Sequence, residues 1–177
     1  MEPWLRPLQT AESRAPDELH VLDLLTSLEQ AYYWLRSHIE AIPAEALWWE
    51  PAPNIPSIGT RLQHVIRSSK RLAAYALSPA PDYEALSEEA QRDWIPEPTS
   101  KEELLAELAA TFSELRSRVE ALTASALSQE CFVGRRRIPV RRSAILHHIA
   151  EHAAYHAGQL ILLLRLWQAQ HRGDSNG

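Results

Sequence analysis

Hydrophobic residues recur at spacings of three and four along most of this chain, which is the period of an α-helix buried on one face. The first such segment covers residues 16–42. Its apolar positions are Leu19, Leu22, Leu25, Leu28, Tyr32, Leu35 and Ile39. Similar patterns cover about 58–78, about 100–122 and a last segment from 140 or 141 to about 170. The pattern therefore predicts an all-α protein built on four long helices.

Residues that cap or interrupt helices mark the links between these segments. Ser57 is a candidate cap for the second helix, and Ser100 with Glu103 forms a capping-box pattern at the start of the third. Four prolines interrupt residues 43–59, which predicts a short turn at 43–48 followed by an extended link. A further helical turn is expected in the polar link, within residues 84–94.

The stretch "CFVGRRRIPV", residues 131–140, breaks the helical period just before the last helix. Gly134 between short β-prone runs indicates a small hairpin or an irregular, extended loop. The four helices with their mixed links then predict a single-domain helical bundle over residues 1–177. Residues 1–15 are interpreted as an N-terminal extension and residues 171–177 as a frayed tail.

The composition narrows the classes of partner. A net charge of −5 and a pI near 5.9 give no general attraction to nucleic acid or to an anionic membrane surface. Unbroken apolar runs such as Leu160 to Leu164 are too short to span a bilayer. The single cysteine, Cys131, excludes an internal disulfide and fits a reducing compartment. We therefore expect a cytoplasmic protein without nucleic-acid or membrane partners.

The last helix carries an unusual cluster of histidines. Four of the eight histidines in the chain lie within residues 147–156. On a helical wheel with His148 at zero, His152 falls at about 40° and His156 at about 80°, inside the apolar stripe. His147 and Glu151 point to the opposite side, which is expected to face water, whereas His148 borders the core.

Histidines at positions i and i+4 of a helix have Cβ atoms about 5–6 Å apart, so both rings can reach one metal ion. His152 and His156 have this spacing. Two core histidines bonded to backbone carbonyls or carboxylates are the alternative, and the wheel leaves both interpretations open. His64 lies at the edge of the apolar stripe on the second helix, a position typical of a surface residue.

Two long motifs resemble a known family. "HHIAEHAAYHAGQLILLLRLW" is similar to the last-helix signature of the DinB/YfiT-like superfamily, and "LWWEPAPNIPSIGTRLQHVI" is similar to the link that leads into its second helix. The segment "RRIPVRRSAILHHIAEH" also fits the entry to the last helix. The resemblance extends from about Leu19 to Gln170.

The resemblance implies a four-helix bundle of up-down-down-up topology, a homodimer, and a divalent metal held by three histidines. By position the ligands are His64, His152 and His156, and His148 matches a position that does not ligate. Zinc or nickel is the first expectation for the metal, with iron or manganese also compatible. Many relatives carry an arginine directly after the last ligand, where this chain has Ala157, so the anion contact of that arginine is in doubt.

The activity implied by the resemblance is metal-dependent transfer of a small thiol to an electrophilic substrate. A metal-dependent hydrolase and a non-catalytic metal-binding or stress-response protein are the alternatives. No catalytic side chain is identified, although Gln159 is placed to bond a ligand or substrate. The five arginines of residues 135–142 predict a solvated loop or a rim that attracts an acidic thiol, and Cys131 is interpreted as a small buried hydrophobe.

Overall fold

The computed structural model describes residues 16–172 of the chain. Its elements, in chain order, are α2 (Pro16–Glu40), α3 (Ala44–Leu47), α4 (Ile58–Leu77), α5 (Tyr83–Ala90), α6 (Lys101–Glu120), α7 (Ala124–Leu127), β1 (Glu130–Val133), β2 (Ile138–Arg141) and α8 (Arg142–Arg172). The predicted all-α class is confirmed. The expected N-terminal extension, 1–15, and the last five residues of the expected tail lie outside the described residues.

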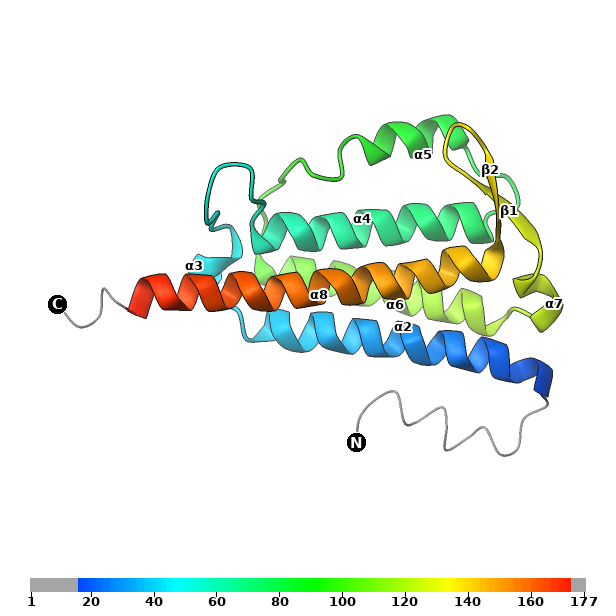
Figure 1. Ribbon diagram of the computed structural model, residues 1–177, viewed down its shortest axis with the longest axis horizontal. Helices are drawn as coiled ribbons and strands as arrows, with labels where there is room; N and C mark the ends of the chain where they lie inside the picture. The colour runs from blue at the N-terminus through cyan, green and yellow to red at the C-terminus, as the bar shows by residue number, and fades with distance from the viewer. Residues whose placement is uncertain (1–15, 173–177) are drawn as a thin grey trace.

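The four long helices lie side by side and share one core (Figure 1). Each helix contributes fully buried aliphatic side chains to that core. They include Leu24, Leu35, Ile39, Ile58, Leu62, Ile66, Leu104, Leu108, Leu146, Ile149 and Leu160. Burying a leucine or isoleucine side chain contributes about 1.5–3 kcal/mol each, so these contacts are the main force that holds the helices together. No helix within residues 16–172 is long and apolar enough to cross a membrane.

Both predicted helix caps are present. The Ser57 hydroxyl accepts a hydrogen bond from the Thr60 amide at 3.1 Å. Ser100 accepts from the Glu103 amide at 3.1 Å, and the Glu103 carboxylate accepts from the Ser100 amide at 3.1 Å, which completes the capping box. Such a cap satisfies amide groups that would otherwise lack a partner, and is worth about 1 kcal/mol.

Two helix ends and one short helix differ from the sequence-based expectation. The first helix ends at Glu40 rather than 42, because the Ala41 and Ile42 amides bond to carbonyls only three residues back and Pro43 follows. The last helix begins at Arg142, since strand pairing extends to residue 141. The short helix α7 was not predicted. It is capped by Thr123, whose hydroxyl accepts from the Ala126 amide at 3.2 Å.

A two-stranded antiparallel hairpin precedes α8. Glu130 pairs with Arg141 and Val133 with Ile138. In the turn between them, Gly134 has a φ of 70° and Arg137 a φ of 49°. The first of these angles suits glycine, which has no Cβ to clash in the left-handed region. The same turn brings three adjacent arginines to the tip of the hairpin.

The link between α4 and α6 covers the part of α4 that carries His64. In Figure 1 these two helices run in the same direction, so residues 78–100 must return along α4 before α6 can begin. Side chains of α4 hold this return segment. The Arg67 guanidinium donates to the Arg92 carbonyl at 3.0 Å and the Ile95 carbonyl at 2.9 Å. The Gln63 amide group donates to the Glu97 carbonyl at 2.6 Å and accepts from its amide at 3.0 Å.

Candidate metal centre

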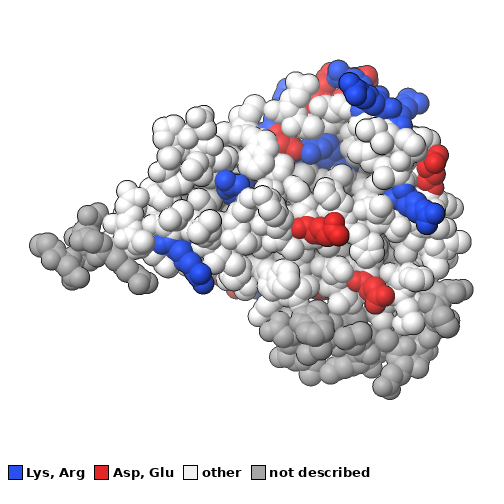
Figure 2. Space-filling model, viewed as in Figure 1, with Lys and Arg blue, Asp and Glu red and all other residues white. Residues whose placement is uncertain are grey.

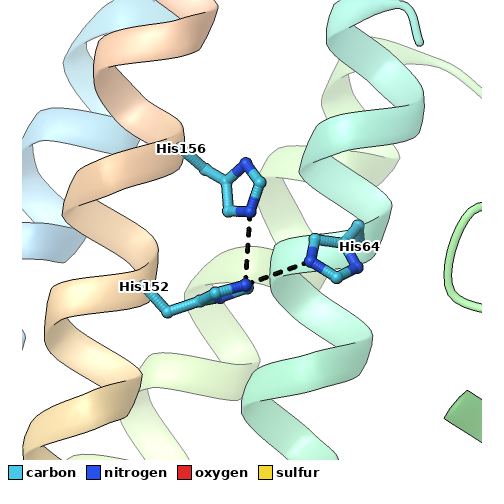
Figure 3. Close-up of side chains that lie close together, drawn as sticks. All are labelled: His64, His152 and His156. Atoms are coloured by element: carbon cyan, nitrogen blue, oxygen red, sulfur yellow. Dashed lines mark hydrogen bonds between the residues drawn. The ribbon is translucent and has the colours of Figure 1, made fainter.

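Three histidines from two helices turn their rings toward one point (Figure 3). His64 comes from α4, and His152 and His156 come from successive turns of α8. The Nε2 atom of His152 lies 3.1 Å from Nε2 of His64 and 3.2 Å from Nε2 of His156. The structure therefore brings together all three residues that the sequence analysis named as ligands.

The donor set fits a divalent metal. Imidazole nitrogens bind zinc at about 2.0–2.1 Å, which places two such nitrogens about 2.8–3.4 Å apart for bond angles of about 90–109°. The two measured Nε2–Nε2 distances fall in this range. Each of these rings also directs its Nδ1 atom to a polar group outside the cluster. Three neutral imidazoles suit several first-row metals, so the donor set does not choose among them.

The outer contact of His64 is a buried carboxylate. Its Nδ1 atom lies 3.5 Å from Oδ2 of Asp93, and the side chains are only 10% and 5% exposed. At 3.5 Å this contact is longer than a good hydrogen bond, and this buried nitrogen has no other partner within the described residues. A carboxylate accepts but does not donate, so it favours the proton on Nδ1 and leaves Nε2 free to bind a metal.

The other two rings are oriented in the same way. Oε1 of Gln159 accepts from Nη1 of Arg61 at 2.8 Å, so this oxygen must also accept from Nδ1–H of His156, 2.8 Å away. The Ser68 hydroxyl donates to the Val65 carbonyl at 3.1 Å, and its oxygen lies 3.4 Å from Nδ1 of His152. These contacts leave both Nε2 lone pairs facing the centre of the cluster.

Burial keeps the α8 pair uncharged. Desolvation, together with the positive charge that neighbouring histidines would carry, lowers the pKa of both His152 and His156 to about 4. For His156, the nearby Arg61 lowers the pKa further. Because metal binding requires the unprotonated ring, these two side chains are ready to bind a cation at neutral pH.

Asp93 is itself held by a buried ion pair. Both of its carboxylate oxygens accept from the Arg71 guanidinium, at 2.6 and 2.5 Å. Burial alone would raise the pKa of Asp93, but its contacts with His64 and Arg71 and the charges of these two side chains outweigh that effect, so the pKa lies below its ordinary value. The next residue, Trp94, stacks on the His64 ring with centroids 4.0 Å apart and planes at 16°. The return segment thus supplies both a charged partner and an aromatic cover to His64.

Sequence reasoning missed Asp93 and Trp94, because they lie in a link without helical periodicity. The sequence of α4, however, does contain a signal for this contact. Gln63, Arg67 and Arg71 recur every four residues on α4, which places three polar side chains in one row. Each of the three contacts residues 92–97. Such a row indicates that a polar segment packs against the helix.

Two placements on the helices differ from the prediction. His64 is buried, with 8% of its surface exposed, rather than at a surface edge, because the return segment covers it. His148 does not border the core. Its side chain is 58% exposed and its Nδ1 lies 4.0 Å from a Glu151 oxygen. His147 is exposed as predicted, and Gln159 contacts the His156 ring.

The arginine-rich hairpin lies at the start of α8, at the upper right of Figure 2, where basic and acidic side chains lie together. Arg135 pairs with Glu84 at 2.8 Å, and Arg137 lies 4.8 Å from the Tyr83 ring centroid. Arg142 donates to the Ala76 carbonyl at 2.9 Å and the Ala126 carbonyl at 3.0 Å. Several of these arginines therefore hold the hairpin in place.

Cys131 is buried at 8% exposure, with Sγ 3.7 Å from the Ala76 carbonyl oxygen, as expected for a small core residue.

The fold and the site together define a class of protein, a helical bundle with three histidines that can hold a metal ion. The chain belongs to the DinB superfamily, whose model matches residues 27–160. The predicted membership is confirmed.

Two solved structures have a similar fold. A DinB-like protein from Bacillus cereus superposes with a TM-score of 0.65 at 19% identity, covering 81% of this chain and 89% of that one. A DinB-like protein from Bacillus subtilis (YjoA) gives a TM-score of 0.61 at 18% identity, covering 80% and 90%. A search of curated protein sequences found no match.

Proposed function

We propose that this protein is a divalent-metal enzyme that transfers a low-molecular-weight thiol to an electrophilic substrate. The observation that carries the proposal is the convergence of three Nε2 atoms, each ring directing its Nδ1 outward. Three protein ligands leave coordination positions for a substrate, which is the arrangement of catalytic rather than structural sites. Zinc or nickel is the metal we expect first, with iron or manganese next.

A divalent ion at this site would act as a Lewis acid that lowers the pKa of a coordinated thiol or water. The residues of the chain have separate tasks. His64, His152 and His156 would hold the ion. Asp93 and Gln159 fix the ring orientation of two of them, and Trp94 excludes water from one side of His64.

We further propose the up-down-down-up bundle topology, the single domain and the homodimer that the family resemblance implies. We expect a cytoplasmic location and no nucleic-acid or membrane partner. The acidic net charge of −5 supports the absence of nucleic-acid binding, and the ion-paired and stacked arginines of the hairpin add to it.

The first test is metal content. Protein purified without chelators should contain close to one equivalent of divalent metal, measured by mass spectrometry of the elements. His152→Ala should lose it, because two nitrogens bind far more weakly than three. His147→Ala is the matched control, since it removes an exposed histidine from the same helix and should retain the metal. Unchanged metal content in His152→Ala would refute the site.

The second test is activity. The metal-loaded protein is incubated with a small thiol and 1-chloro-2,4-dinitrobenzene, and loss of the free thiol is followed. We expect consumption that depends on the metal and is abolished in His152→Ala. Metal binding without thiol consumption would refute the transferase proposal and favour hydrolysis or a non-catalytic metal-binding role.

A further inference from the structure

Arg61 lies one turn before His64 on α4 and reaches the metal centre from the side. Its Nη1 donates to Oε1 of Gln159 at 2.8 Å, and the same oxygen accepts from Nδ1 of His156 at 2.8 Å. One amide oxygen therefore joins the guanidinium to a ligand ring. The Arg61 Cζ atom also lies 5.9 Å from the centroid of the Trp94 ring, which is 44% exposed and stacks on the His64 ring.

The charge of Arg61 has no acidic partner within residues 16–172. No carboxylate oxygen among these residues lies within 4.0 Å of its guanidinium, whereas Arg71 and Arg116 each have one. Its Nε atom is buried and makes no hydrogen bond to the described part of the protein. Desolvation lowers the pKa of this arginine, so keeping the side chain charged costs free energy. An arginine in this position is arranged for an anion that arrives with a ligand.

The net charge around the site also favours an anionic ligand. Counted over these contacts, the positive charges are those of a divalent ion, Arg61 and Arg71, and the single negative charge is that of the Asp93 carboxylate. That carboxylate is already bonded through both oxygens to Arg71. A loaded site would therefore carry a surplus of three positive charges in a partly buried environment, and an anionic ligand would be attracted to it.

We propose that Arg61 is a specificity-determining residue that binds a carboxylate on the thiol substrate, so the protein selects anionic small thiols. This inference rests on the proposed function. Nη1 is occupied by Gln159, and the planar guanidinium keeps further donors that match the two oxygens of a carboxylate. The thiol sulfur would lie toward the three histidines, and the carboxylate toward Arg61 and the exposed side of Trp94.

The experiment measures thiol binding rather than turnover. Cobalt-loaded protein is titrated with 3-mercaptopropionate and with 3-mercaptopropionamide, which have nearly the same shape and differ in charge, and the visible absorption of the cobalt is followed. We expect the wild type to bind the carboxylate at least tenfold more tightly than the amide. In Arg61→Met this preference should fall close to one, and Arg61→Lys should retain part of it. Arg118→Met, which removes an exposed arginine of α6, should retain the full preference.

The ratio of the two affinities separates recognition from a structural role. If Arg61 only held Gln159 and His156 in place, Arg61→Met would weaken both thiols equally and leave the ratio unchanged, which would overturn the inference. Equal binding of both thiols by the wild type would overturn it as well, while the proposed function would stand. No absorption change with either thiol would overturn the proposed function and this inference with it.

Discussion

Replacing Asp93 with asparagine tests the buried ion pair and the orientation of His64 in one variant. Asparagine preserves the size of the side chain and removes its charge. It leaves the Arg71 guanidinium, whose side chain is 13% exposed, without a carboxylate. It also replaces the oxygen that faces Nδ1 of His64 with a neutral amide group.

The expected cost in stability follows from the burial. Removing one partner of a buried pair costs about 3–5 kcal/mol. Because asparagine keeps one neutral acceptor for Arg71, we expect about 3 kcal/mol for Asp93→Asn. For a domain of this size that corresponds to a fall in Tm of about 6–12 °C. Metal affinity should fall about 10- to 100-fold, as is usual when an outer-shell partner of a ligand is lost.

Glu107→Gln is the matched control. It makes the same change from carboxylate to amide at a pair of similar length, 2.6 Å to Lys70, but both side chains are about half exposed. Exposed pairs contribute less than about 1 kcal/mol, so stability and metal affinity should hardly change. Urea denaturation of the metal-free proteins gives the first quantity, and competition with a chelator gives the second.

Two results would refute the reasoning about Asp93. If Asp93→Asn and Glu107→Gln cost the same, the burial of the pair has no energetic consequence. If Asp93→Asn loses stability but its metal affinity stays within twofold of the wild type, Asp93 anchors the return segment and does not act on His64.

Two further predictions concern pH and helix packing. Because the folded pKa of His152 and His156 lies near 4, below the ordinary 6.5, the metal-free protein should lose stability as pH falls from 6.5 to 4. A Tm that does not change over this pH range would contradict this prediction. An equally steep fall of the Tm in the double variant His152→Gln/His156→Gln would contradict it as well. Gly59→Ala should destabilise by about 1–3 kcal/mol, since its Cβ would meet the Trp48 ring at 2.7–2.8 Å. Gly158→Ala meets nothing within 4 Å and should stabilise α8 by about 0.5–1 kcal/mol; equal effects of the two changes in a denaturation assay would refute the packing argument.

The helices and their caps were predictable because their causes are local. Ser100 and Glu103 are three residues apart, and the apolar spacing along α8 places His152 and His156 on one buried face without knowledge of any other helix. The hairpin region was visible for the same reason, through Gly134 and the break in period.

His64 was different. Its helix position alone indicated a surface residue, and only the family resemblance pointed to it as a ligand. The structure buries it because a segment about thirty residues later in the chain returns along α4.

The surroundings of the three histidines were decided by tertiary structure. Asp93 meets Arg71 across 22 residues of sequence, and Arg61 meets Gln159 across 98. Spacing within one helix carries no information about such contacts, because they depend on the path of a link that lacks periodicity and on the packing of α4 against α8. The sequence by itself therefore determined the four long helices, their caps and the buried face of α8 that carries His152 and His156. A buried charge finds a partner only if the right segments pack together. Asp93 has such a partner, whereas Arg61 has none within the described residues. In our proposal, this difference in pairing determines which ligands the site attracts.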